Sequence, residues 1–521
     1  MRRRPTTGRL VHLGRRLSRI DRGRSTAYRD ESIETDPHPE VVIQRRLSLV
    51  ATLGAIAVVV AAFALTAAAP ITRTEPTFHG LRKDAPVEEG EGSALAARVR
   101  RSGAQAMEAV EPAPAPVQRL GFRGGDDWEP AIAADRFGHV YALWTHYGED
   151  PSCPDCPSPH MELQVSDDGG TTWGDPRALV PRATARQDDP QIVVDPVDGR
   201  TVYAAFMLGD KASMYVAKST DFGQTWRSVL IEPLERGTDK EILAVRGPHV
   251  YVAYNAVQKI YASVSHDAGR TWTTYPIIHN TNSSYGWSLP AGGAVDSRGN
   301  AYFSWAGYEA NGKPSGEVNL FVTASSDGGR TWRVSRVDVS EAPPRCESCG
   351  WAYWGPQMAL AVDGEDTVYV LWNANAVKFG VNRMYFSSST DGARTWGRRQ
   401  EISDAPRGSN NLFPAIVARR SGDVRIAWQD DRMGFDDGTD SRKARWNTYY
   451  RTSTNGGESW SSELQLSEYV PGYERYKKRT GYLEPYGDYF EFDIDGDGRT
   501  QALWGEADNY WGPGNVWYTR I

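Results

Sequence analysis

A short acidic motif that recurs along the chain constrains its fold more than any other feature. The pattern Ser-x-Asp-x-Gly-x-Thr-Trp occurs at 166–173, 219–226, 265–272 and 325–332, and in degraded form at 389–396 and 453–460. Within the pattern, the carboxylate can accept backbone N–H bonds inside a tight turn, the glycine can adopt a positive φ, and the tryptophan can cover the turn. The motif therefore predicts six similar turns, each of which closes a similar folding unit.

The two degraded copies keep the spacing but lose individual groups. Ala393 replaces the glycine in the fifth copy, and Asn455 and Ser459 replace the aspartate and the threonine in the sixth. Repeats at intervals of 46 to 64 residues indicate a propeller or a solenoid. The motif resembles the Asp box, or BNR repeat, of sialidase-like β-propellers, and the resemblance covers about 116–521. It implies a fold and no single activity, because one scaffold can host unrelated functions.

The number of blades follows from a second pattern. Two alternating, β-branched segments joined by a short turn, typical of paired antiparallel strands, appear at 130–144, 190–206, 242–254, 290–305, 356–372, 414–428 and 490–504. The seventh copy is followed by one further strand and no box, and 117–122 can supply the missing outer strand. We therefore predict an all-β, seven-bladed β-propeller closed by pairing of its two ends, which removes free strand edges. Six blades is the alternative.

The strand order also assigns two faces to the ring. With the strands of each blade labelled A to D from the centre outward, the Asp boxes lie in the C–D turns, on what we call the box face. The B–C loops and the D–A connections lie on the opposite, open face. These connections are longer and more varied, as is typical of loops that carry function.

The N-terminal region predicts a membrane anchor. Residues 1–46 are arginine-rich without apolar periodicity, as in a disordered tail, and 47–69 contain no charge over a length that can span a bilayer as a helix. Arg45 and Arg46 keep the tail in the cytoplasm under the positive-inside rule. Residues 70–115 are then a linker, and 116–521 form an extracytoplasmic domain on the plasma membrane. The alternative is a signal peptide cleaved after the alanines at 67–69, which gives a secreted domain.

The charge of the chain bears on its partners. The formal net charge is −7, and the arginine-dense segment lies outside the repeats. A basic face of the kind that binds nucleic acid is therefore not expected. The predicted partners are the membrane, through 47–69, and a glycan or protein at the open face.

Four cysteines form two C-x-x-C pairs that the strand order places on the open face. Cys153 and Cys156 lie in the B–C loop of the first blade, and Cys346 and Cys349 precede the fifth. Such pairs could together hold zinc through four thiolate ligands. Oxidising surroundings favour disulfides instead, either within each pair or between the loops, and a redox-active dithiol is a third reading. The expected arrangement is a disulfide between the loops that holds a lid over the channel.

Polar and aromatic residues gather where the A strands begin and the B strands end. The set comprises Asp188, Asp189, Lys240, Glu241, Trp354, Asn373, Asn410, Asn411, Gln429, Asp430, Asp431, Arg432, Asp488, Tyr489 and Glu506. Within it, the candidate catalytic residues are Asp430, Arg432, Tyr489 and Glu506, and the candidate ligand-binding residues are Asp189, Trp354, Asn411 and Asp488. Carboxylates, an arginine and aromatic rings around a concave mouth suit a polar ligand such as a sugar. The competing interpretation is that these side chains satisfy loop backbones.

The resemblance also implies a catalytic pattern that this chain matches only in part. Sialidases hold the substrate carboxylate with three arginines, and the first belongs to an Arg-Ile-Pro motif that opens the first blade. The matching residues here are Trp128, Glu129 and Pro130, so tryptophan occupies the arginine position. Tyr489, or Tyr486, with Glu484 could imitate the tyrosine–glutamate nucleophile pair of the family.

Three functions are consistent with these patterns. The first is a membrane-anchored propeller that binds a glycan or protein at its open face. The second is a sialidase-like glycoside hydrolase acting on extracellular glycoconjugates through paired carboxylates. The third is a metal- or disulfide-dependent cell-envelope factor centred on the four cysteines.

Overall fold

The computed structural model describes 114–521, apart from gaps at 122–124, 182–184, 210–212, 232, 234–236, 257–258, 279–286, 311–312, 345–353, 435–444, 469–488 and 508–513. The expected tail, membrane span and most of the linker lie outside these residues. Among the described residues, no helix has the length and apolarity needed to cross a membrane.

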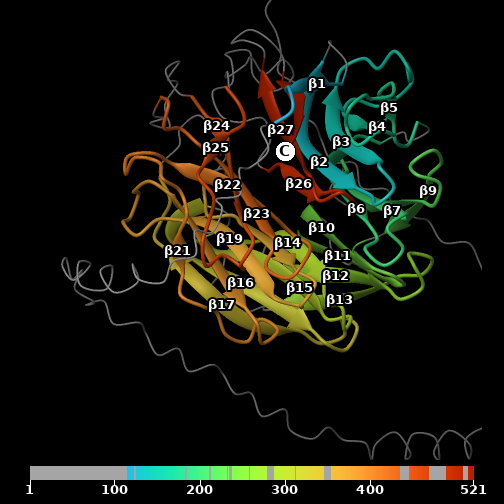
Figure 1. Cartoon of the computed structure of the whole chain (residues 1–521). Coiled ribbons are helices and arrows are strands. Elements are labelled where there is room, and N and C mark those ends of the chain that lie inside the picture. Colours follow the sequence, from blue (N-terminus) through green and yellow to red (C-terminus); the bar gives the residue numbers. More distant parts are fainter. Residues whose placement is uncertain are drawn as a thin grey trace, which may run out of the picture. The chain divides into compact units, whose positions relative to one another are not determined.

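Seven four-stranded antiparallel sheets make up this part of the chain, which confirms the seven-bladed propeller (Figure 1). The first three blades are β2 (Asp126–Ala134), β3 (Val140–Tyr147), β4 (His160–Ser166) and β5 (Arg177–Ala178); β6 (Gln187–Val194), β7 (Val202–Leu208), β8 (Met214–Ser219) and β9 (Arg227–Ile231); and β10 (Thr238–Arg246), β11 (His249–Ala256), β12 (Lys259–Ser265) and β13 (Thr273–Ile278).

The next three blades follow the same order from A to D. They are β14 (Trp287–Val295), β15 (Ala301–Ala310), β16 (Lys313–Ser325) and β17 (Arg333–Ser340); β18 (Met358–Val362), β19 (Val368–Ala374), β20 (Arg383–Ser389) and β21 (Gln400–Glu401); and β22 (Asn411–Ala418), β23 (Val424–Asp430), β24 (Asn447–Ser453) and β25 (Leu464–Gln465).

The seventh blade joins the two ends of the domain. Its inner strands are β26 (Glu491–Ile494), β27 (Thr500–Ala507) and β28 (Gly514–Arg520), and its outer strand is β1 (Gln118–Leu120) from the start of the domain. Gln118 pairs with Tyr518, and Leu120 pairs with Val516. The predicted closure is therefore confirmed, and Figure 1 shows β1 beside the red C-terminal strands.

The Asp boxes form the C–D turns, as predicted. In the fourth blade, Ser325 Oγ accepts the N–H of Gly329 at 2.8 Å and donates to Asp327 at 2.9 Å. The Asp327 carboxylate accepts the N–H groups of Arg330 and Thr331 and the Thr331 hydroxyl at 2.6 Å. Burial raises the pKa of Asp327 and is the largest single effect, but the hydrogen bonds together outweigh it and lower the pKa to about 2. The box is thus a self-contained turn with no carboxylate to spare for a ligand.

The sixth box shows which hydrogen bonds of this turn remain when asparagine replaces the charged aspartate. Asn455 Oδ1 accepts the Ser459 N–H at 3.0 Å, and its Nδ2 donates to the Ser459 hydroxyl at 2.8 Å.

We therefore expect Asp327→Ala to lower the free energy of unfolding by about 1 kcal/mol, as the loss of a helix cap does. Asp327→Asn should lower the free energy of unfolding by about half as much. Chemical denaturation measures both, and equal losses would contradict this account of the turn.

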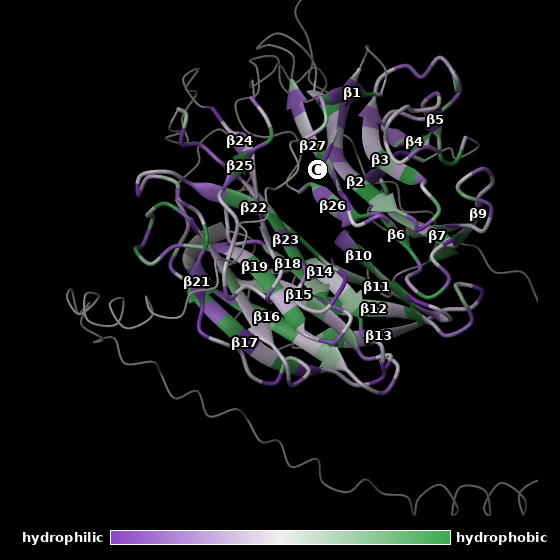
Figure 2. Cartoon of the chain, in the orientation of Figure 1, coloured by the Kyte–Doolittle hydropathy of each residue, from purple (hydrophilic) through white to green (hydrophobic). Residues whose placement is uncertain are grey.

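The core lies between the blades. The B strands place Trp144, Trp305, Trp372, Trp428 and Trp504 in almost fully buried positions. Separate clusters of buried hydrophobic residues join neighbouring blades, for example β2, β3 and β4 with β6 and β7. Figure 2 shows hydrophobic stretches along the strands and mostly hydrophilic residues on the connecting loops. Because each blade buries its faces against two neighbours, closure of the ring contributes to the stability of every blade.

Candidate functional site

A central cavity of about 420 Å³ lies among the A strands of the ring. Its wall is mainly apolar, with residues such as Leu243, Ala294 and Val417. Asp189, Lys240, Glu241 and Tyr489 line it near the starts of the A strands, which places them toward the open face. An apolar cavity with a few convergent polar groups is the usual form of a small-ligand site.

Four A strands approach this end of the cavity through the same backbone irregularity. The pairing of β2, β6, β10 and β22 with their B strands shifts register near the start of each strand. At the shift, Glu129, Asp189, Lys240 and Phe413 have positive φ values of 52° to 57°. Such a backbone is costly for residues other than glycine, and bulges of this kind re-aim side chains. Three of the four re-aimed side chains are charged.

These charged side chains meet across the ring, and with Glu241 and Tyr489 we call them the mouth cluster. Lys240 Nζ of the third blade lies 3.0 Å from Asp189 Oδ1 of the second and 3.7 Å from Glu129 Oε1 of the first. The same ammonium lies 5.2 Å from the ring centroid of Tyr489, in the seventh blade. The Tyr489 hydroxyl donates to the carbonyl of Pro190 at 3.0 Å. One lysine thus links four blades at the mouth.

Glu241 is the most unusual member of the mouth cluster. It is 2 % exposed, and neither of its carboxyl oxygens has a hydrogen-bond partner among the described residues. Burial raises its pKa well above the usual value, and the nearby charge of Asp189 adds to the shift. Burial of Glu241 thus favours the protonated form of its carboxyl group, against the opposing effect of the nearby Lys240 charge.

Two more acidic residues sit deeper in the cavity and face the first blade. Glu491 Oε2 accepts the N–H of Ile132 at 3.2 Å, and Asp493 Oδ2 accepts the N–H of Ala134 at 2.7 Å. Burial raises the pKa of Glu491 to about 8 and that of Asp493 to about 6, although these N–H bonds act in the opposite direction. The two side chains therefore satisfy the inner edge of β2 across the closing junction.

Two of the expected site residues form a separate network in the sixth blade. Asp430 is fully buried, and its carboxylate binds Arg432 at 2.7 Å and accepts the Trp428 indole N–H at 3.0 Å. Arg432 also pairs with Glu463 at 2.5 Å and lies over the ring of Tyr449 at 3.8 Å. Neither residue lines the cavity. Asp430 and Arg432 therefore tie the end of β23 to the outer part of its blade.

The other expected residues are divided between the mouth and the scaffold. Asp189 and Tyr489 belong to the mouth cluster, whereas Glu506 accepts the Trp504 indole N–H at 2.9 Å and lies outside the cavity lining. Trp354 is buried against Trp446, with ring centroids 5.9 Å apart. Asn411 Nδ2 donates to the carbonyls of Asn382 and Ser409. Asp488 lies outside the described residues.

The first cysteine pair forms its own disulfide. Cys153 and Cys156 are bonded to each other with an S–S distance of 2.01 Å. The expected bridge between the two loops is therefore wrong for these residues, and they have no thiolates to offer a zinc site built from both pairs. Two cysteines three residues apart can close within one turn, which needs no second loop. Cys346 and Cys349 lie outside the described residues.

The position of the first sialidase arginine is part of the scaffold here. Trp128 is buried, and its ring lies edge-on to Tyr147 at 6.3 Å. The next residue, Glu129, joins the mouth cluster as a negative charge. The mouth therefore presents an acid beside the place where a carboxylate clamp would need a cation.

Glu241 belongs to the polar set expected at the strand ends but not to the candidate catalytic or ligand-binding residues, and comparison of the blades would have singled it out. In blades 1, 2 and 6 the residue at the Glu241 position is Pro130, Pro190 or Pro414. A carboxylate at a position that repeats as proline departs from the scaffold pattern, which is a usable signal for function. Glu129 has no such signal in the sequence. It joins the site only because its carboxylate lies close to the Lys240 ammonium of the third blade.

No protein-family model matches this sequence, and no curated protein sequence does so either. Solved structures that resemble the chain include a protein of unknown function from Dyadobacter fermentans, with 14% identity, coverage of 78% of this chain and 98% of that one, and a TM-score of 0.42. A mutant of the NanB sialidase from Streptococcus pneumoniae matches with 13% identity, coverage of 62% and 68%, and a TM-score of 0.40. An ulvan lyase matches with 11% identity, coverage of 77% and 95%, and a TM-score of 0.42. At these scores the neighbours carry no conclusion about chemistry.

Proposed function

We propose that this chain is a membrane-tethered, extracytoplasmic propeller that binds a glycan at the mouth cluster. The observation that carries the proposal is Glu241, a buried carboxyl group without a hydrogen-bond partner among the described residues, in the wall of the central cavity. An unsatisfied buried polar group costs about 1–3 kcal/mol, and a ligand that bonds to it recovers that cost. Native proteins rarely keep such a group without a use for it.

The surrounding groups fit a polyol. Hydroxyl groups can donate to Asp189 and Glu129 and accept from Lys240, and they can form a hydrogen bond with the Glu241 carboxyl group. The ring of Tyr489 supplies an apolar surface with a polar edge. The acidic side chains of Glu491 and Asp493 also line the cavity. A neutral or amino sugar therefore suits the site better than an anionic one.

The membrane tether is supported by the sequence. Residues 47–69 carry no charge and follow directly after Arg45 and Arg46. A helix of this length and polarity spans a bilayer with its arginine side in the cytoplasm. The linker 70–115 then holds the domain clear of the membrane, where extracellular glycans are accessible. Protease protection of the N-terminal tail in sealed vesicles tests this orientation.

A second candidate function is hydrolysis of the bound glycan. Glycosidases use a pair of carboxyl groups of which one has a raised pKa, and Glu241, whose pKa burial raises, lines the cavity together with Asp189. Substitution by glutamine separates the two candidates. Glutamine keeps a donor and an acceptor for binding but cannot release a proton to a leaving group.

The test uses the full-length protein in detergent on a glycan array, followed by calorimetry with the strongest ligand. We expect Glu241→Leu to weaken binding by about 10- to 100-fold, since an apolar side chain cannot bond to the ligand. Glu241→Gln should bind within about threefold of the original. Lys378→Met, at an exposed position in the B–C loop of the fifth blade, is the matched control and should change nothing.

Each outcome of this test has a defined meaning. Unchanged affinity in Glu241→Leu would contradict binding at the mouth cluster. Turnover of a fluorogenic glycoside that disappears in Glu241→Gln while binding persists would replace a binding function with hydrolysis at the same site.

A further inference from the structure

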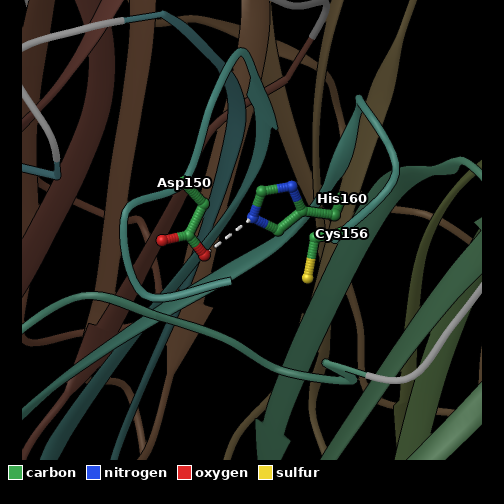
Figure 3. A group of neighbouring side chains, drawn as sticks. All are labelled: Asp150, Cys156 and His160. Atoms are coloured by element: carbon green, nitrogen blue, oxygen red, sulfur yellow. Dashed lines mark ion pairs between the residues drawn. The ribbon is translucent and has the colours of Figure 1, made fainter. Parts of the chain in front are cut away.

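The loop that joins β3 to β4 in the first blade brings three metal-binding side chains together. Asp150, Cys156 and His160 offer one ligand atom each, and these atoms all lie within 4.8 Å of one another (Figure 3). None of the three residues lines the central cavity. Cys156 is bonded to Cys153, so its sulfur is not a thiolate and is a poor ligand in this state. We propose that the loop binds a zinc ion once this disulfide is reduced, with Cys153, Cys156, Asp150 and His160 as ligands.

Asp150 and His160 already have the spacing of two zinc ligands. Asp150 Oδ2 lies 3.4 Å from His160 Nε2. Nitrogen and oxygen ligands lie about 2.0–2.2 Å from zinc, so two of them at tetrahedral positions are roughly 3.3–3.6 Å apart. Asp150 is 3 % exposed, and its Oδ2 atom has no hydrogen-bond partner among the described residues. Figure 3 shows this carboxylate directed at the imidazole, so its oxygen is available to an ion at that position.

The other contacts of these two side chains hold them in place. His160 Nδ1 donates to the carbonyl of Pro157 at 3.1 Å, which fixes the tautomer and leaves Nε2 to coordinate. Asp150 Oδ1 accepts the N–H of Ser152 at 2.6 Å. His160 Nε2 also shares a proton with Glu162 Oε2, which lies 3.0 Å away. Zinc displaces that proton, because a histidine that binds a metal must first lose the proton on the coordinating nitrogen.

The two cysteines lie in a tight turn beside these ligands. The Cys156 N–H donates to the Cys153 carbonyl at 2.9 Å, and the Cys153 N–H donates to the Asp150 carbonyl at 3.0 Å. Two cysteines in such a C-x-x-C turn can present both thiolates to one ion. Because the two sulfurs are bonded to each other, both start close to the other donors. Cys156 is also partly exposed, which gives a reductant access to its sulfur.

The switch is a two-electron reaction with a dithiol protein as the reductant. One partner thiolate attacks Cys156 Sγ, the bond to Cys153 breaks, and Cys153 leaves as a thiolate. The second partner thiolate then attacks the partner sulfur of the mixed disulfide and releases Cys156. The partner becomes a disulfide, and two electrons and two protons pass to this chain. Zinc replaces the protons on the two thiols, and two thiolates, an imidazole and a carboxylate form a set that suits tetrahedral zinc.

The test compares zinc binding by the oxidised and the reduced full-length protein. The starting protein carries Cys346→Ser and Cys349→Ser, so that only one cysteine pair remains. It is reduced with a phosphine, freed of reductant by gel filtration without oxygen, and titrated with zinc against a chromogenic chelator. We expect about one zinc per reduced chain and none per oxidised chain. Cobalt in place of zinc should give the thiolate charge-transfer bands and visible absorption of a tetrahedral site.

Three variants of the starting protein identify the ligands. Asp150→Asn and His160→Gln should each weaken zinc binding by the reduced protein by about 100-fold or more, since each removes a ligand. Asp155→Asn changes an exposed carboxylate in the same turn, so it is the matched control and should bind zinc like the starting protein. Melting temperatures of the oxidised variants, which hold no zinc, show that each is folded.

Three outcomes would overturn the proposal. The first is a reduced starting protein that binds no zinc. The second is full zinc affinity in both Asp150→Asn and His160→Gln, because the cysteine pair alone would then hold the ion. The third is equal zinc binding by the oxidised protein, in which no thiolate can take part.

Discussion

Deletion of residues 1–121 is expected to lower the melting temperature of the propeller and to broaden its unfolding transition, whereas deletion of 1–113 should change neither. The two truncations differ by only eight residues, 114–121, which contain β1. These residues complete the seventh blade, because β1 is the fourth strand of the sheet formed by β26, β27 and β28. Without them, β28 becomes an open edge at the junction with the first blade.

The bonds that the longer deletion removes are well defined. The Ala115 N–H donates to the Arg520 carbonyl at 2.8 Å, and the Gln118 side chain donates to the Gly170 carbonyl of the first Asp box at 3.1 Å. Leu120 is buried in the cluster that joins the seventh and first blades. Loss of this residue and of the strand should cost on the order of 5 kcal/mol, or roughly 10 °C in melting temperature.

The measurement is differential scanning calorimetry of both truncations, with size-exclusion chromatography to detect association through the open edge. The shorter deletion should give a single sharp transition and a monomer-sized peak. If both proteins melt at the same temperature with the same cooperativity, then closure through β1 does not stabilise the ring.

Replacement of Glu491 by glutamine is expected to stabilise the protein at alkaline pH and to have no effect near pH 4.5. The folded-state pKa of Glu491 is raised to about 8 by burial, from a usual value of 4.5. Below pH 4.5 the carboxyl group is protonated in both states and contributes no pH dependence. As the pH rises from 4.5 to 8, the unfolded chain loses the proton while the folded chain holds it, so stability falls.

Glutamine mimics the protonated side chain and keeps an acceptor for the Ile132 N–H. The stability difference between variant and original should therefore grow through this window to on the order of 3 kcal/mol above about pH 8, in favour of the variant. Melting temperatures between about pH 4.5 and pH 9 measure it. Glu365→Gln, at an exposed turn on the box face, is the control and should show no such growth. A flat difference for Glu491→Gln would refute the raised pKa.

The fold could be predicted from the sequence because its signals are local. Each Asp box satisfies its own backbone within a single turn, as the bonds around Asp327 show. Each pair of A and B strands is likewise visible as alternation along the chain. The closure of the ring could also be predicted from the sequence. The seventh copy of the two-strand pattern lacks an outer strand, and the start of the domain supplies it.

The candidate site was less predictable because it depends on which side chains meet across the ring. Strand ends of every blade carry polar residues, and the sequence cannot show that Asp430 turns to Arg432 while Asp189 turns to Lys240. The direction of Lys240 depends on its left-handed backbone, which only the structure reveals.

The central claim is that the open end of the cavity, at Glu241, holds the ligand. A crystal structure of the full-length protein with the strongest glycan from the array tests this claim most directly. The account predicts a sugar hydroxyl within hydrogen-bond distance of the Glu241 carboxyl group, with Lys240 and Tyr489 in contact with the same sugar. A glycan bound on the box face, or on the outer strands with the cavity empty, would contradict it.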